Sequence, residues 1–244
     1  MMNAYASRVV LFDIDGTLLN TGGLGCEAFR RGLERATGVP DDLAYISFAG
    51  NTDRRVLAQV MERRGRELDE ETVRQVFALM AVELEALLAG AEVEEIAGAG
   101  RLVRELAGRG AALGLVTGNI RACAYLKLRS IALDDLFPFG GFGDDHAERS
   151  AIARAAMAAA RVAGHGGARA CLVGDTPSDM LAGRALGIPA LGVASGNYTA
   201  EDLFAAGARR VARDFQDTAA WLDWVEEALD SMATDRPTAG ERAG

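Results

Sequence analysis

The sequence is poor in the residues that build zinc clusters and disulfide-rich proteins. It has two histidines, His146 and His165, and three cysteines, Cys26, Cys123 and Cys171. The cysteines are widely spaced and form no Cys-x-x-Cys pair, and the histidines lie far apart in the sequence. This pattern argues against a histidine-based metal cluster and a disulfide framework, and favours reduced, buried cysteines.

The sequence also lacks long hydrophobic runs and a surplus of basic residues. No apolar stretch reaches the ~18 residues of a membrane helix, and the first ten residues, MMNAYASRVV, lack the basic and apolar regions of a signal peptide. The net charge of −9 disfavours a nucleic-acid-binding groove, which needs a basic face. We therefore expect a cytoplasmic protein with neither nucleic acid nor a membrane as its partner.

Lysine is nearly absent. Lys127 is the only lysine among 26 basic residues, and all the others are arginine. An acidic chain can still bind an anionic ligand if a local group of basic residues lies at its binding site. The few basic residues near the acidic motifs described below therefore matter for function.

What the chain does contain is an alternation of apolar, β-prone runs with amphipathic helical patterns. Strands are predicted at 8–13, 111–117, 139–144, 169–175 and 189–194, and a sixth short one at 208–212. Helices are predicted at 100–110, 120–131, 148–164 and 178–186. Continuous rather than alternating apolar strands are typical of parallel sheets that are buried on both faces. The alternation predicts an α/β fold with a doubly wound parallel sheet.

Residues 20–97 interrupt this alternation. They contain no strand-like run, and three amphipathic segments at 25–38, 53–65 and 68–90 predict helices. We interpret 20–97 as an all-helical domain inserted into an α/β core made of 1–19 and 98–232. The remaining residues, 233–244, are polar and without pattern, which predicts a flexible tail.

Acidic and small polar residues follow three of the predicted strands. Asp13 and Asp15 end the first strand, and Thr117, Gly118 and Asn119 end the second. In doubly wound sheets, ligands bind at the carboxyl ends of the strands.

The 169–175 strand ends in a similar way, in Gly-Asp-Thr-Pro-Ser-Asp. This turn holds Asp175, and Asp179 lies one helical turn further along the chain. A single acidic turn is common, but two acidic turns and a Thr-Gly-Asn turn, each after its own buried strand, predict a shared site.

These segments match a known family. DIDGT (13–17), LVTGN (115–119) and VGDTPSDM (173–180) resemble the signature motifs of the haloacid dehalogenase-like (HAD) superfamily. The helical insert resembles the C1 cap of that family, and 192–211 resembles the corresponding part of phosphoglycolate-phosphatase-type members. The resemblance implies a Rossmann-like core and phosphoric monoester hydrolysis with Mg²⁺ on a small phosphorylated metabolite.

The resemblance also implies a role for each acidic residue. Asp13 would be the nucleophile that forms an aspartyl-phosphate, and Asp15 the general acid and then the general base. Mg²⁺ prefers hard oxygen ligands, which Asp13, the backbone carbonyl of Asp15, and Asp175 would supply. Asp179 would hold a metal-bound water or Asp175 itself.

Other residues would bind the substrate. Thr117 would hydrogen-bond a phosphate oxygen, helped by the backbone N–H groups of Gly118 and Asn119. The basic residue that neutralises the phosphoryl group is usually a lysine followed by proline in this family. Here Arg149 is the favoured candidate for that role, and Lys127 is its rival.

The inserted helical domain should close over the site and contact the leaving group, and it would thereby recognise the substrate. Its most polar tight turn lies at 48–57, where Asn51, Thr52 and Arg54 are candidates for substrate contact. An ordinary helix N-terminus capped by Asn51 or Thr52 explains the same pattern equally well.

Several other activities share this core. A haloacid dehalogenase needs neither the second aspartate nor a metal, and the acidic residues argue against it. A phosphonatase needs a lysine in the cap, and 20–97 contains none. A sugar-phosphate mutase stays open as an alternative, and so does a non-catalytic binding module, although the complete acidic set disfavours the latter.

Overall fold

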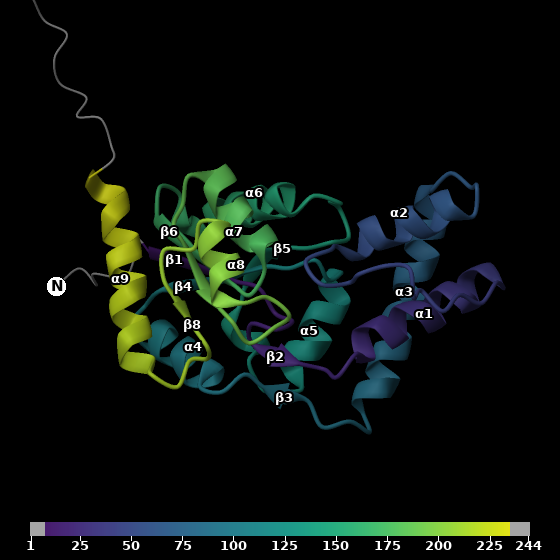
Figure 1. Ribbon diagram of the computed structural model, residues 1–244, viewed down its shortest axis with the longest axis horizontal. Helices are drawn as coiled ribbons and strands as arrows, with labels where there is room; N and C mark the ends of the chain where they lie inside the picture. Colours follow the sequence, from purple (N-terminus) through teal and green to yellow (C-terminus); the bar gives the residue numbers. More distant parts are fainter. Residues whose placement is uncertain (1–7, 235–244) are drawn as a thin grey trace, which may run out of the picture.

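A six-stranded parallel sheet forms the centre of the molecule. The computed structural model describes residues 8–234, and its strands lie in the order β5-β4-β1-β6-β7-β8 (Figure 1). All five neighbouring pairs are parallel, which confirms the predicted α/β fold. The strands are β1 (Arg8–Phe12), β4 (Ala112–Val116), β5 (Phe139–Gly141), β6 (Arg169–Gly174), β7 (Ala190–Val193) and β8 (Val211–Ala212).

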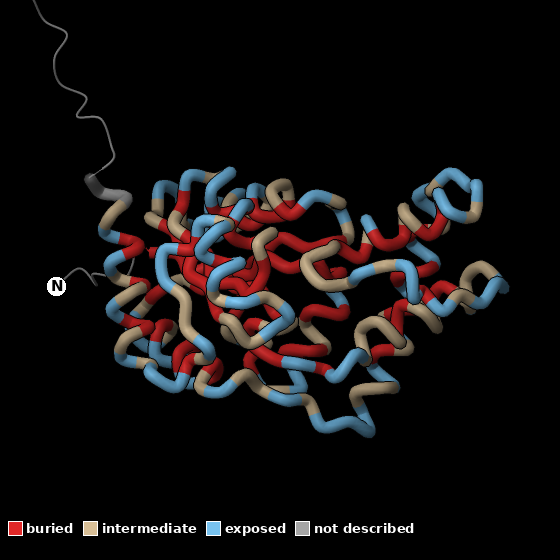
Figure 2. The backbone as a smooth tube through the Cα atoms, viewed as in Figure 1, coloured by how far each residue is buried: buried red, intermediate tan, exposed pale blue. Residues whose placement is uncertain are grey.

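Strand β1 occupies the middle of the sheet because its sequence is apolar on both sides. All five of its residues are buried, and Val10 pairs with Leu113 of β4 and with Cys171 of β6. Val10 and Phe12 belong to the apolar cluster on one face, and Val9 and Leu11 to the cluster on the other. Figure 2 shows the buried sheet at the centre, enclosed by helices with exposed outer surfaces.

Helices cover both faces of the sheet. Residues of α4, α5 and α9 pack into the cluster on one face, and residues of α6 and α7 into the cluster on the other. A short helix, α8, packs beside β7 and β8. The helices of the core are α4 (Ala99–Gly108), α5 (Arg121–Arg129), α6 (Arg149–Ala160), α7 (Pro177–Leu186), α8 (Ala200–Ala205) and α9 (Thr218–Thr234).

Three further helices lie to the side of this core, at the right of Figure 1. They are α1 (Leu24–Thr37), α2 (Asp53–Arg63) and α3 (Glu70–Leu88), and all three follow β1 in the chain. They share an apolar cluster of their own, which also includes Ile120 and Cys123 at the start of α5. The helical group therefore packs against the core next to the end of β4.

The expectation that 20–97 contains no strand is wrong at its edges. Strand β2 (Leu19–Asn20) pairs antiparallel with β3 (Glu94–Glu95), so the segments that enter and leave the helical group are hydrogen-bonded to each other. Two-residue strands carry too little pattern to be recognised in a sequence.

Helices α8 and α9 were not expected from the sequence. Helix α8 has only six residues. Helix α9 packs on the sheet through Trp221, Leu222, Val225, Ala228 and Leu229. Most of the tail predicted at 233–244 lies outside the described residues. No helix within 8–234 is long and apolar enough to cross a membrane.

Candidate active site

The carboxyl ends of β1, β4 and β6 open into one cavity of about 320 Å³. These three strands are neighbours in the sheet, so their ends meet at the same edge. Most of the residues that the sequence analysis singled out line this cavity: Asp13, Asp15, Asn51, Thr117, Gly118, Asn119, Lys127, Arg149 and Asp175. The helical group contributes the opposite wall with Gly25, Cys26, Phe48, Asp53 and Met80.

A tight turn after β1 brings both aspartates to the cavity. The carbonyl of Ile14 accepts hydrogen bonds from the backbone N–H groups of Thr17 and Leu18, at 3.1 and 2.8 Å. Gly16 has a φ of +76°, and a Cβ atom there would lie 2.3 Å from Oδ2 of Asp175. Only glycine combines this conformation with so close a neighbour. The turn thereby lets Asp13 and Asp15, two residues apart, face the same cavity.

Three buried carboxylates gather at the base of the cavity. Oxygen atoms of Asp13, Asp175 and Asp179 all lie within 4.8 Å of one another. Burial raises the pKa of Asp13 to about 7, with smaller contributions from Asp179 and Asp15, although Arg149 opposes the shift. Burial, followed by Asp13 and Asp179, also raises the pKa of Asp175 well above its ordinary value. A divalent cation would offset this repulsion, so the donor set fits a metal that prefers carboxylate oxygens.

Asp179 has other partners in this cluster. Its Oδ2 accepts from the backbone N–H and from Oγ1 of Thr176, at 3.1 and 2.7 Å, in a capping box that starts α7. Its Oδ1 accepts from Nε and Nη2 of Arg149, at 2.9 and 2.6 Å. Both oxygens of Asp179 are thus engaged, which favours a supporting role in which it orients Arg149.

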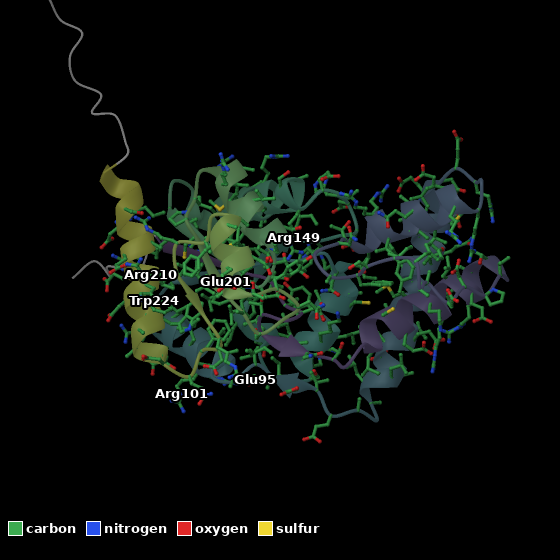
Figure 3. All side chains as sticks on the ribbon, in the orientation of Figure 1. Glu95, Arg101, Arg149, Glu201, Arg210 and Trp224 are labelled. Atoms are coloured by element: carbon green, nitrogen blue, oxygen red, sulfur yellow. The ribbon has the colours of Figure 1, made fainter. Side chains whose placement is uncertain are left out.

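The two candidate cations contact different aspartates. Nη2 of Arg149 lies 2.8 Å from Oδ2 of Asp13, and Nζ of Lys127 lies 2.7 Å from Oδ2 of Asp15. Figure 3 places Arg149 near the centre of the molecule, among the side chains between the core and the helical group. Arg149 is the residue beside the candidate nucleophile, as the family resemblance suggested. Lys127, the rival candidate, pairs instead with the candidate acid–base group, and its own side chain is buried.

The turn after β4 is tied to the turn after β1. Nδ2 of Asn119 donates to Oδ2 of Asp15 at 2.6 Å and to Oγ1 of Thr117 at 2.7 Å. The backbone N–H of Asn119 also donates to Oγ1 of Thr117, at 3.3 Å. A Cβ on Gly118 would lie 2.2 Å from the carbonyl oxygen of Asn51, so only glycine allows the helical group to approach this closely.

The three residues predicted at the tip of the helical group have different positions. Asn51 lines the cavity, whereas Thr52 and Arg54 do not. Thr52 caps α2 through Arg55 N–H, and its hydroxyl donates to the carbonyl of Ala147 at 3.0 Å. Nη1 of Arg54 donates to the carbonyl of Asp144 at 2.8 Å. Thr52 and Arg54 therefore connect the helical group to the core, and the capping alternative holds for Thr52.

Asp53 is a residue of this cavity that the sequence analysis missed. Its backbone N–H donates to the carbonyl of Gly118, and its Oδ2 accepts from the backbone N–H of Ile120, both at 2.8 Å. Burial raises the pKa of Asp53 to about 7, even though Lys127 and the Ile120 hydrogen bond act in the opposite direction. An acidic residue in the first turn of α2 was the available signal, but that position is common for ordinary helix starts.

The raised pKa of Asp53 predicts a pH-dependent stability. Its ordinary value is 3.8 and its folded value about 7, so the folded protein binds the extra proton between these values and loses stability as pH rises through this window. Asp53→Asn lacks this titrating group, so it should not share the loss. The free energy of unfolding of the variant minus that of wild type should therefore rise by about 1–2 kcal/mol between about pH 5.5 and about pH 7, and then level off. Denaturant titrations at a series of pH values measure this difference.

Asp69→Asn is the matched control for that experiment. Asp69 is an exposed N-cap of α3 whose pKa is lowered by hydrogen bonds from Thr72, so it is ionised in both states over this window. Its difference from wild type should stay constant there. A constant difference for Asp53→Asn as well would show that Asp53 is not a buried, proton-binding group.

Comparison with known proteins agrees with this geometry. The family model described as haloacid dehalogenase-like hydrolase matches residues 10–193. A phosphoglycolate phosphatase from Rhodospirillum rubrum is 29% identical over 231 residues, which cover 92% of this chain and 95% of that protein. The pyrophosphatase PpaX from Bacillus pumilus is 28% identical over 204 residues, covering 83% and 90%. The crystal structure of CbbY from Rhodobacter sphaeroides in complex with phosphate superposes with a TM-score of 0.69 at 22% identity, covering 89% and 99%.

Proposed function

Because the chain belongs to the haloacid dehalogenase-like hydrolases and is a phosphoric monoester hydrolase, we propose that it is a Mg²⁺-dependent phosphatase of a small metabolite. The observation that carries this proposal is the pairing at the end of β1. Asp13 and Asp15 face one cavity, and each carboxylate has its own cation. Two differently supported carboxylates suit two different roles, a nucleophile and an acid–base group.

Asp13 is the proposed nucleophile. One of its oxygens attacks the phosphorus, the ester P–O bond breaks, and an aspartyl-phosphate forms. Arg149 lies 2.8 Å from Oδ2 of Asp13, so it holds the carboxylate in place and adds positive charge where the phosphoryl group arrives. Thr117 and the turn that follows it line the same cavity and supply hydrogen-bonding groups for phosphate oxygens.

Asp15 is the proposed acid–base group. It gives a proton to the leaving oxygen when the aspartyl-phosphate forms, and takes one from the water that hydrolyses this intermediate. The overall products are inorganic phosphate and an alcohol, and both aspartates return to their starting state.

The proposed metal site uses the carboxylates of Asp13 and Asp175 together with the backbone carbonyl of Asp15. When bound, Mg²⁺ would neutralise charge on the phosphoryl group and on the nucleophile. Neighbouring residues fix the position of the Asp175 carboxylate. Oγ1 of Thr17 donates to its Oδ1 at 3.1 Å. Its Oδ2 packs against Gly16 and Gly196, where a Cβ atom would lie only 2.3 and 2.0 Å away.

The helical group is proposed to act as a cap. In this proposal 20–97 is the cap, and 1–19 with 98–232 is the core. The cavity of about 320 Å³ is lined on the cap side by residues such as Phe48 and Met80, and its size suits a small substrate. Similarity to phosphoglycolate phosphatases makes phosphoglycolate the first substrate to test.

The proposal is tested by measuring phosphate release from a panel of small phosphomonoesters with Mg²⁺. The panel includes phosphoglycolate, sugar phosphates, p-nitrophenyl phosphate and inorganic pyrophosphate, the last because of the PpaX similarity. We expect release from at least one monoester. Transfer of phosphate to a second position of a sugar, without release, would favour a mutase. No turnover of any kind would favour a binding module and contradict the proposal.

A further inference from the structure

We propose that Lys127 is a positioning residue that holds Asp15 in the orientation needed to protonate the leaving group. The inference rests on the proposed function, because it assigns a task to the acid–base group of that reaction. Lys127 lies in α5, outside the acidic motifs. It is the only lysine of the chain.

The contacts of Lys127 support a positioning role. Its Nζ donates to Oδ1 and Oδ2 of Asp15, at 2.8 and 2.7 Å, and to Oδ1 of Asn119 at 2.7 Å. An ammonium group has three N–H donors, so all of them are engaged within the protein. To bind an anionic part of the substrate directly, Lys127 would first have to give up one of these partners.

The exposure of the two partners shows which one faces the substrate. The side chain of Lys127 is 4% exposed, whereas that of Asp15 is 43% exposed. The carboxylate of Asp15 therefore lies between the ammonium group and the open part of the cavity. We expect Lys127 to act on the reaction mainly through Asp15.

The site fits a lysine better than an arginine. The three acceptor oxygens surround one point, which suits a compact ammonium group rather than a planar guanidinium. The space is also limited from the cap side, since a Cβ on Gly25 would lie 3.0 Å from Nζ of Lys127.

Asn119 extends the network to the phosphate side of the cavity. It accepts from Lys127 and donates to both Asp15 and Thr117. The side chain that carries the proton and the side chain proposed to bind phosphate are thus held in one rigid arrangement. Arg149 contacts Asp13 and Asp179 instead.

This arrangement predicts an effect that depends on the leaving group. As the P–O bond breaks, the electrons of that bond go to the leaving oxygen and a proton from Asp15 neutralises it. An alkyl phosphate releases a strongly basic alkoxide and needs this proton, whereas p-nitrophenolate is a weak base and leaves without it. Misplacing Asp15 should therefore slow alkyl substrates selectively.

The test compares Lys127→Met with Arg129→Met. Arg129 is on the same helix, but its side chain is exposed and pairs with Asp134 outside the cavity. On the best alkyl phosphate of the panel, we expect kcat of Lys127→Met to fall about 10- to 100-fold with little change in KM. On p-nitrophenyl phosphate we expect less than about a threefold change. Arg129→Met should match wild type on both substrates.

Gly25→Ala keeps the charge of Lys127 and places a methyl group against its Nζ and Cε atoms, at 3.0 and 3.4 Å. The added methyl group should displace the ammonium group by a few tenths of an ångström and cause a smaller loss with the same selectivity for alkyl substrates. Gly108→Ala is its control, because a Cβ there meets nothing within 4 Å. If circular dichroism shows that Lys127→Met does not fold, Gly25→Ala decides the question.

Two results would overturn the inference while leaving the proposed function intact. One is an equal loss of kcat on both substrates, which would indicate a general structural effect. The other is a rise in KM with unchanged kcat, which would make Lys127 a substrate-binding group. Absence of turnover by the wild-type protein would instead contradict the proposed function itself.

Discussion

Asp13→Asn should lower phosphate release by at least about 10³-fold, because an amide oxygen cannot replace the carboxylate that attacks phosphorus. The substitution preserves the shape of the side chain at a position where the residue is only 5% exposed. The fold should therefore survive, and circular dichroism should match wild type. The rate is measured as inorganic phosphate released from the best substrate of the panel.

Direct detection of the intermediate makes this prediction more specific. Wild-type protein quenched in acid during turnover should yield a phosphorylated peptide containing residue 13, and the variant should not. Asp135→Asn is a suitable control, because Asp135 is exposed and does not line the cavity. Phosphate on another residue, or full activity in Asp13→Asn, would remove Asp13 from the role of nucleophile.

Removal of divalent metal should have an effect of similar size. After dialysis against EDTA, activity should fall by at least about 10³-fold, and Mg²⁺ should restore it. The reason lies in the cluster of Asp13, Asp175 and Asp179, where buried carboxylates within 4.8 Å repel one another and the incoming phosphate. Activity that persists undiminished in EDTA would contradict a metal-dependent mechanism.

Metal binding can be measured without turnover. Mg²⁺ should raise the midpoint of thermal unfolding of the metal-free protein, since a ligand that binds only the folded state stabilises it. Asp175→Asn removes one of the proposed ligands and should abolish most of this shift. An unchanged shift in Asp175→Asn would place the metal elsewhere.

Much of the site was predictable because it is encoded next to the strands. The run before Asp13 is apolar from Val9 to Phe12, which indicates a strand buried on both faces, and Asp15 follows it in a glycine-containing turn. Thr117 and Asp175 follow β4 and β6 in the same way. In an alternating α/β chain the parallel strands all end at one edge, so local sequence was enough to predict that these residues meet.

Other features depend on contacts between distant segments, and the sequence alone could not supply them. Lys127 contacts a carboxylate 112 residues away, and the pattern of α5 does not reveal which partner it faces. Asp53 looks like any acidic residue in a first helical turn until α2 docks on Gly118 and Ile120. The two-residue strands β2 and β3 exist only because they pair with each other.

The amino-acid sequence by itself therefore determined the parallel sheet, the inserted helices and the acidic residues at the strand ends, since each follows from local periodicity and turn chemistry. The tertiary structure decided which cation supports which aspartate. Arg149 reaches Asp13 from the start of α6, and Lys127 reaches Asp15 from α5. Those distances are set by how the helices pack on the sheet, and packing geometry is a property of the whole chain.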